Sequence, residues 1–103
     1  MEQNYEISGT RMIYHMPLEL DHHSAAKIRT QIDCMIDAGN VRELVLDFSG
    51  TDFMDSSGVG VVIGRHKKLM LYGGKVMACG VNERIGKLFG SSGLDRIIAR
   101  VEV

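Results

Sequence analysis

Apolar side chains recur at helical spacing in two long stretches of the chain. Between residues 22 and 38 they return every three to four positions, as at Ile28 and Ile32, which is typical of a helix that buries one side. Gly39 follows, and glycine readily adopts the left-handed conformation in which many helices end. A second run of helical length covers residues 57–71 and stops before a pair of glycines. The pattern predicts a helix in each stretch.

Shorter apolar runs between these stretches predict strands. The segment over residues 41–48 contains a compact apolar set, Leu44, Val45, Leu46 and Phe48, which is typical of a central strand with parallel neighbours. Residues 5–7 and 12–16 flank a Ser-Gly-Thr cluster and are expected to form a β-hairpin. Residues 18–21 and 49–55 are expected to be connections without strands. The remaining predicted elements are a strand over 75–80, a short helix over 82–89 that Asn82 caps, and a last strand over 97–103.

Strands that alternate with helices indicate an α/β fold built on a mixed β-sheet. A chain of 103 residues buries roughly 65% of the surface that its unfolded form exposes, which is enough for one core. No repeat, low-complexity tract or linker interrupts the order of elements. We therefore expect a single domain over residues 1–103.

Composition and charge exclude several kinds of partner. Lys and Arg number 12 and Asp and Glu 13, so the net charge is −1 and offers no field for nucleic acid or anionic lipid. Residues 1–4 are polar, unlike a signal peptide, and no apolar run approaches the roughly 20 residues that span a bilayer. Cys34 and Cys79 lack metal-ligand spacing and are expected to be reduced thiols in the core. The sequence thus predicts a soluble, cytoplasmic protein.

The candidate chemistry lies where the run at 41–48 gives way to the helix at 57–71. Asp55, Ser56, Ser57 and Gly58 stand at this junction. In one interpretation Asp55 or Ser56 caps the helix, Gly58 permits close packing, and the site is purely structural. In the other, Ser56 is exposed and accepts a phosphoryl group, whose charge the helix dipole favours. Local sequence leaves both interpretations open.

Other kinds of site find little support in the sequence. The pattern Gly-x-Ser-x-Gly of serine hydrolases is absent around Ser56, and no complete phosphate-binding glycine motif is present. His22 and His23 are adjacent, so on a helix they point in different directions, unlike metal ligands four residues apart. We expect no metal, no cofactor and no catalytic residue. Arg65, with Lys67 and Lys68, is expected on a solvated helix face.

Two segments carry a family resemblance. Residues 18–25, Leu-Glu-Leu-Asp-His-His-Ser-Ala, and residues 52–61, Asp-Phe-Met-Asp-Ser-Ser-Gly-Val-Gly-Val, resemble two motifs of the STAS-domain anti-sigma factor antagonists, above all those of the sporulation sigma-F pathway. The likeness extends through residues 64–67, 73–74 and 88–94, nearly the whole chain. Leu18 stands where the family usually has glycine, which would permit positive φ or close backbone approach.

The resemblance implies a role in transcription regulation by partner switching. Unphosphorylated, such a protein binds an anti-sigma factor that is also a serine kinase and so releases the sigma factor. The kinase then phosphorylates the serine after the motif aspartate, here Ser56, and a PP2C-type phosphatase restores it. By the same resemblance, the partner-binding residues would include Asp21, His22, Asp55, Ser56, Ser57 and Gly58. The alternative is a STAS scaffold or sensory module that binds a nucleotide or other small ligand without a sigma-factor circuit.

Overall fold

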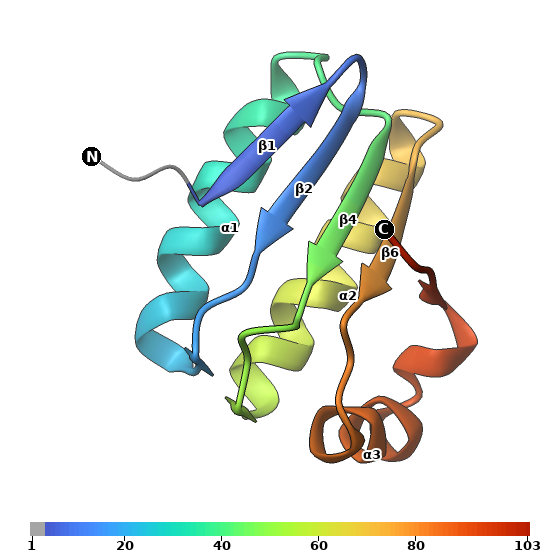
Figure 1. Cartoon of the computed structure of the whole chain (residues 1–103). Helices are drawn as coiled ribbons and strands as arrows, with labels where there is room; N and C mark the ends of the chain where they lie inside the picture. The colour runs from blue at the N-terminus through green and yellow to red at the C-terminus, as the bar shows by residue number, and fades with distance from the viewer. Residues whose placement is uncertain (1–3) are drawn as a thin grey trace.

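A five-stranded mixed sheet forms the centre of the computed structural model, which describes residues 4–103. Residues 1–3, on which the expectation about a signal peptide partly rests, lie outside the described residues. The strand order is β1-β2-β4-β6-β7 (Figure 1). β1 and β2 form the predicted antiparallel hairpin, and the other neighbours are parallel. The strands are β1 (Tyr5–Ser8), β2 (Arg11–His15), β4 (Glu43–Asp47), β6 (Lys75–Cys79) and β7 (Ala99–Arg100).

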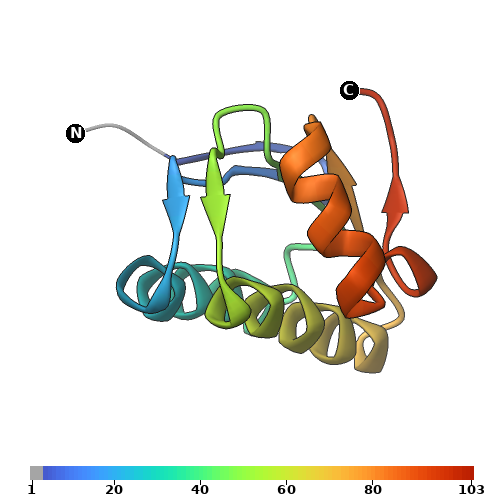
Figure 2. The same ribbon diagram turned by 90° about the horizontal axis from the view of Figure 1, so that it is seen from below.

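Two parallel helices cover one face of this sheet. α1 (His22–Asp37) and α2 (Ser56–Leu71) lie behind the strands in Figure 1 and side by side in Figure 2. α3 (Glu83–Ser92) lies at the end of β6 and is followed by a short 3-10 turn over Leu94–Arg96. The predicted α/β class, the mixed sheet and the central position of β4 are confirmed.

A second, two-stranded sheet was not expected. β3 (Glu19–Leu20) and β5 (Phe53–Met54) pair in parallel, although both segments were predicted to be connections. Each strand leads directly into a helix, β3 into α1 and β5 into α2 (Figure 2). The prediction was wrong because two residues are too few to show the alternation that marks a strand. The small sheet sets the starts of α1 and α2 next to each other.

Several element boundaries differ from the predicted ones by a few residues, and three of them have a clear physical cause. α2 begins at Ser56 and not at 57, because Asp55 supplies the cap. α3 runs to Ser92, past the predicted end at 89, and stops where Gly93 takes a left-handed φ of 84°. The last strand is only Ala99–Arg100, since the amides of Ile97 and Ile98 donate to Leu94 in a turn and not to a neighbouring strand.

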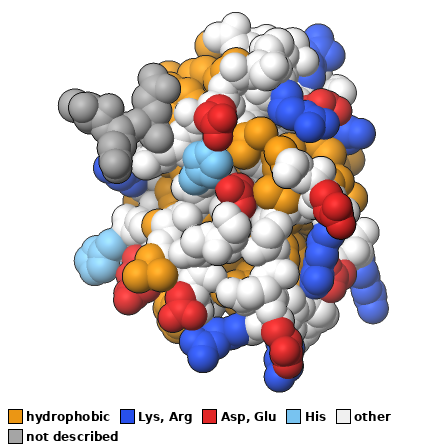
Figure 3. All heavy atoms as spheres, in the orientation of Figure 1, with side chains coloured by type: hydrophobic (Ala, Val, Ile, Leu, Met, Phe, Trp, Pro, Cys, Tyr) orange, Lys and Arg blue, Asp and Glu red, His pale blue; other side chains and the backbone are white. Residues whose placement is uncertain are grey.

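The main core lies between the sheet and the two helices. Side chains of β4 alternate between the two faces of the sheet. Leu44 and Leu46 join this core, and Val45 points to the opposite face. There Val45 packs with Met77 and Cys79, and Val101 of the C-terminal segment packs against them. Figure 3 views this face, where apolar side chains lie beside acidic and histidine side chains. No helix within residues 4–103 has the length and apolar character needed to cross a membrane.

Two expectations about burial were wrong. Cys79 is buried, but Cys34 is exposed because it lies outside the stripe by which α1 packs, formed by Ala25, Ile28, Ile32 and Ile36. Arg65 is only 6% exposed and not on a solvated face. Its Nε lies 2.8 Å from Oδ1 of Asp33 on α1, so an ion pair joins the two helices under the surface.

Candidate functional site

The starts of α1 and α2 are built in the same way. In register, Glu19 pairs with Phe53 and Leu20 with Met54, so the aspartates that follow both strands occupy equivalent positions. Leu20 and Met54 are buried and hold the pair against the core. The amide of Asp55 donates to the carbonyl oxygen of Leu20 at 3.2 Å. The two predicted motifs are therefore brought together, although the paired residues Leu20 and Met54 are 34 positions apart in the chain.

Asp21 caps α1. Its Oδ1 accepts hydrogen bonds from the amides of His23 and Ser24, both at 3.0 Å. The Ser24 hydroxyl in return accepts from the amide of Asp21 at 3.0 Å, which completes a capping box. The bond from the Ser24 amide lowers the pKa of the Asp21 carboxyl below its ordinary value, so this side chain is an anion at neutral pH.

Asp55 caps α2 and so fixes the place of Ser56. Oδ1 of Asp55 accepts from the amides of Ser57 at 2.8 Å and Gly58 at 3.3 Å. Ser56 is the first residue of the helix and is exposed, whereas Ser57 is half-buried. Because Asp55 already supplies the cap, the hydroxyl of Ser56 is not needed for that purpose. The sequence left open whether this site only caps the helix or also offers a phosphate acceptor. With the cap supplied by Asp55, the exposed hydroxyl of Ser56 is available as an acceptor.

Gly58 lies beneath this surface. A Cβ on it would come within 2.5 Å of Cγ of Met54 and 2.8 Å of Cγ of Leu20. The missing side chain lets α2 approach the β3–β5 pair closely. Gly58 is buried, so it can contribute to a partner-binding surface only through the position that it gives to its neighbours.

Leu18, which stands where the resemblance leads us to expect glycine, has an ordinary backbone conformation. Leu18 is 63% exposed, and its carbonyl oxygen accepts from the amides of Asp52 at 2.8 Å and Phe53 at 3.2 Å. Among residues 4–103, only glycines have positive φ, so Leu18 does not occupy a conformation that requires glycine. Its side chain extends into solvent.

A groove of about 300 Å³ runs between the first turns of the two helices. His22, exposed at the start of α1, lies on one side, and Ser57 lies on the other. Arg29 also lines the groove, and sequence reasoning did not single it out. Its spacing of seven residues from His22 puts both on one helix face, and this signal could have identified it. Within residues 4–103, no cluster of three His, Cys, Asp or Glu side chains could hold a metal ion.

The sequence matches a known family along the whole chain. The sequence model of the STAS domain covers residues 1–103. The chain belongs to the STAS-domain family.

Within that family the chain is similar to anti-sigma factor antagonists. It is 38% identical over 87 residues to the anti-sigma F factor antagonist of Paenibacillus polymyxa, with 84% of this chain and 74% of the relative covered. The structure of the antagonist SpoIIAA in its unphosphorylated form matches with a TM-score of 0.86 and 31% identity, over 95% of this chain and 86% of SpoIIAA. The phosphorylated form of Bacillus SpoIIAA matches with a TM-score of 0.79 and 31% identity, over 95% and 89%.

Proposed function

We propose that this chain is an anti-sigma factor antagonist that is switched by phosphorylation of Ser56. Unphosphorylated, it binds an anti-sigma factor that is also a serine kinase, and the sigma factor is released. Phosphorylation by that kinase ends the binding, and a PP2C-type phosphatase reverses the modification. In this role the chain is a cytoplasmic binding protein and a substrate of other enzymes, not an enzyme itself.

One observation carries the assignment to Ser56. It is an exposed hydroxyl at the first position of α2, beside a cap that Asp55 supplies independently. A kinase must bring the acceptor oxygen to about 3–3.5 Å from the transferred phosphorus, which an exposed side chain on a rigid helix start allows. Ser57 satisfies this less well, because it is half-buried and faces the groove between the helices.

The surroundings of Ser56 explain how a phosphate would end the binding. The kinase holds its nucleotide phosphates next to the acceptor, so the new phosphoserine faces like charge in a desolvated interface. Asp21 and Asp55 add negative charge on this chain's side. If this repulsion and desolvation made the free energy of binding about 4 kcal/mol less favourable, the affinity would fall roughly a thousandfold.

Phosphorylation by the cognate kinase tests the site. After incubation with the kinase and ATP, mass spectrometry is expected to find one phosphate, on Ser56. Ser56→Ala should still capture the kinase but should not be released by ATP, and Ser56→Asp should bind weakly. Ser57→Ala is the matched comparison for the acceptor and should still receive one phosphate, on Ser56. Phosphate on Ser57, or on no residue, would contradict the assignment of Ser56 as the acceptor.

A pull-down distinguishes the alternative role. Recovery of an ATPase of the anti-sigma kinase type supports the switch. A large assembly of STAS proteins without such a kinase would favour a scaffold or sensory module and contradict the proposal.

A further inference from the structure

Thr51 is one of only two polar or charged side chains that are buried among residues 4–103; the other is Arg65. It is 2% exposed and lies in the loop between β4 and β5, five positions before Ser56. A buried hydroxyl must form hydrogen bonds to offset the loss of water. The partners of Thr51 therefore show what the loop is fixed to.

All three polar groups of Thr51 are bound, each to a different part of the molecule. Its amide donates to the carbonyl oxygen of Phe48, just after β4, at 2.9 Å. Its hydroxyl donates to the carbonyl oxygen of Pro17, between β2 and β3, at 2.9 Å. Its carbonyl oxygen accepts from Nδ2 of Asn82 at 3.0 Å. The start of the β5 segment is thus tied to a central strand, to the β3 segment and to α3.

Asn82 is itself held in place at its other end. Its Oδ1 accepts from the amide of Ile85 at 2.8 Å and caps α3. One amide side chain therefore fixes the start of α3 with its oxygen and the loop of Thr51 with its nitrogen. The side chain is exposed, so this tie is weaker than the buried hydroxyl bond of Thr51.

These ties act directly upstream of the acceptor. From Thr51 the chain runs through Asp52 and Phe53, whose amides donate to Leu18, to the cap at Asp55. If the start of this segment were loose, the β3–β5 pair and the first turn of α2 would sample more conformations. A kinase would then find the productive arrangement less often, and apparent affinity falls in proportion to the competent fraction.

We propose that Thr51 and Asn82 are positioning residues that hold the segment 51–55, and with it Ser56, in the conformation that the kinase binds. The proposal rests on the proposed function as far as the kinase is concerned. The mechanical part, that these two side chains order the β3–β5 pair, does not depend on any partner.

Three variants distinguish the loss of these hydrogen bonds from a general loss of stability. Thr51→Val keeps the shape of the side chain and removes the hydroxyl, whereas Thr51→Ser keeps the hydroxyl. Asn82→Asp retains an oxygen to cap α3, because Asp and Asn cap equally well, but it cannot donate to Thr51. Urea unfolding checks that each variant remains folded before it is compared.

Hydrogen exchange on the free protein tests the mechanical part. In Thr51→Val, the amides of Asp52, Phe53 and Asp55 are expected to exchange about fivefold faster, the factor that corresponds to about 1 kcal/mol for one net hydrogen bond, and in Asn82→Asp they are expected to exchange faster by a smaller factor. Amides of β4 and β6 should be unchanged, and Thr51→Ser should match the wild type. Unchanged exchange at the three amides in both variants would overturn the proposal.

Kinetics with the cognate kinase test the functional part. Both tie-breaking variants are expected to raise the KM for phosphorylation with an unchanged kcat, because the chemistry in the bound complex is the same; the rise equals the fall in the competent fraction and is at most about fivefold, with Thr51→Val the larger. Thr51→Ser should restore the wild-type KM. Equal KM values, or a fall in kcat alone, would overturn the positioning role. Failure of the wild-type chain to be phosphorylated at all would instead contradict the proposed function, and hydrogen exchange would still decide whether the ties order the segment.

Discussion

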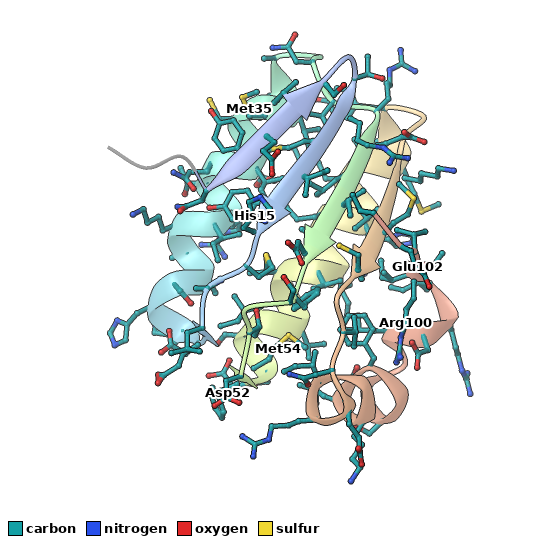
Figure 4. The ribbon with its side chains drawn as sticks, in the orientation of Figure 1. His15, Met35, Asp52, Met54, Arg100 and Glu102 are labelled. Atoms are coloured by element: carbon teal, nitrogen blue, oxygen red, sulfur yellow. The ribbon has the colours of Figure 1, made fainter. Side chains whose placement is uncertain are left out.

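His15 lies between two carboxylates, one at each ring nitrogen. Its Nε2 is 2.6 Å from Oε2 of Glu6 on β1, and its Nδ1 is 2.8 Å from Oδ2 of Asp47 on β4. Figure 4 labels His15 at the end of β2, between these two strands. Only the protonated ring can donate to both partners at once. Glu6, and after it Asp47, accordingly raise the pKa of His15 above its ordinary value of 6.5.

This contact predicts that stability falls as pH rises. Because the folded pKa is the higher one, the stabilisation is complete below pH 6.5 and is lost as pH passes the folded pKa. The effect should be modest, since the His15 side chain is 43% exposed. Urea unfolding of the wild type and His15→Gln, repeated at intervals across this range, measures it. The difference in free energy of unfolding between them should shrink with rising pH.

The neighbouring Cys79 and a second variant help to assign the pH dependence to His15. Burial raises the pKa of the neighbouring Cys79 thiol to about 11, so that group stays protonated through the range tested. Glu6→Gln removes the partner with the largest effect and should reduce the pH dependence of the wild type. A difference between wild type and His15→Gln that does not change with pH would refute the coupling.

Arg65 shows why residue type alone misleads about burial. The sequence grouped it with Lys67 and Lys68 by charge, but Val61, Arg65 and Leu69 recur every four residues and lie on the buried side of α2. The position of Arg65 in the helical repeat therefore predicts its burial better than its charge does. The partner Asp33 could not be predicted from local sequence, because it lies on a different helix and only the packing of α1 against α2 brings the two together.

At the scale of elements, the glycines of α2 give a sharp comparison. A Cβ on Gly58 would collide with Met54 and Leu20, whereas one on Gly60 or Gly64 would meet nothing within 4 Å. We expect Gly60→Ala and Gly64→Ala each to raise the free energy of unfolding by up to about 1 kcal/mol, since glycine is a poor helix former. Gly58→Ala should lower it by about 1–3 kcal/mol through overpacking. Urea unfolding measures all three, and destabilisation by the substitution at 60 or 64 would contradict the open space seen there.

The elements that sequence could predict are those with long patterns. α1 and α2 repeat an apolar spacing over enough residues to identify the helical period, and the central strand is marked by consecutive apolar residues. β3 and β5 have two residues each, and their pairing depends on hydrogen bonds between segments far apart in the chain. For the candidate site, the sequence proposed the serine and both aspartates but left the cap of α2 undecided. Only the hydrogen bonds from Ser57 and Gly58 to Asp55 assign the cap, and so leave Ser56 free.

At the scale of the whole molecule, the question is whether a phosphate on Ser56 changes the fold or only the surface. Structures of SpoIIAA in unphosphorylated and phosphorylated forms both match this fold, with TM-scores of 0.86 and 0.79. In this chain the phosphate would add about −1.5 to −2 to a net charge of −1. It would stand at the positive end of the α2 dipole, which favours it, and near Asp21 and Asp55, which oppose it.

We therefore expect the phosphorylated protein to unfold in urea within about 1 kcal/mol of the unmodified protein, because the two electrostatic effects are similar in size and partly cancel. Ser56→Ala, exposed to kinase and ATP in the same way, controls for effects of the treatment. Helical circular dichroism should be equal for all three samples. A loss of more than about 2 kcal/mol, or of helical signal, would mean that the phosphate melts the start of α2. The switch would then act through the fold, and binding would be lost because the surface that the partner recognises is no longer formed.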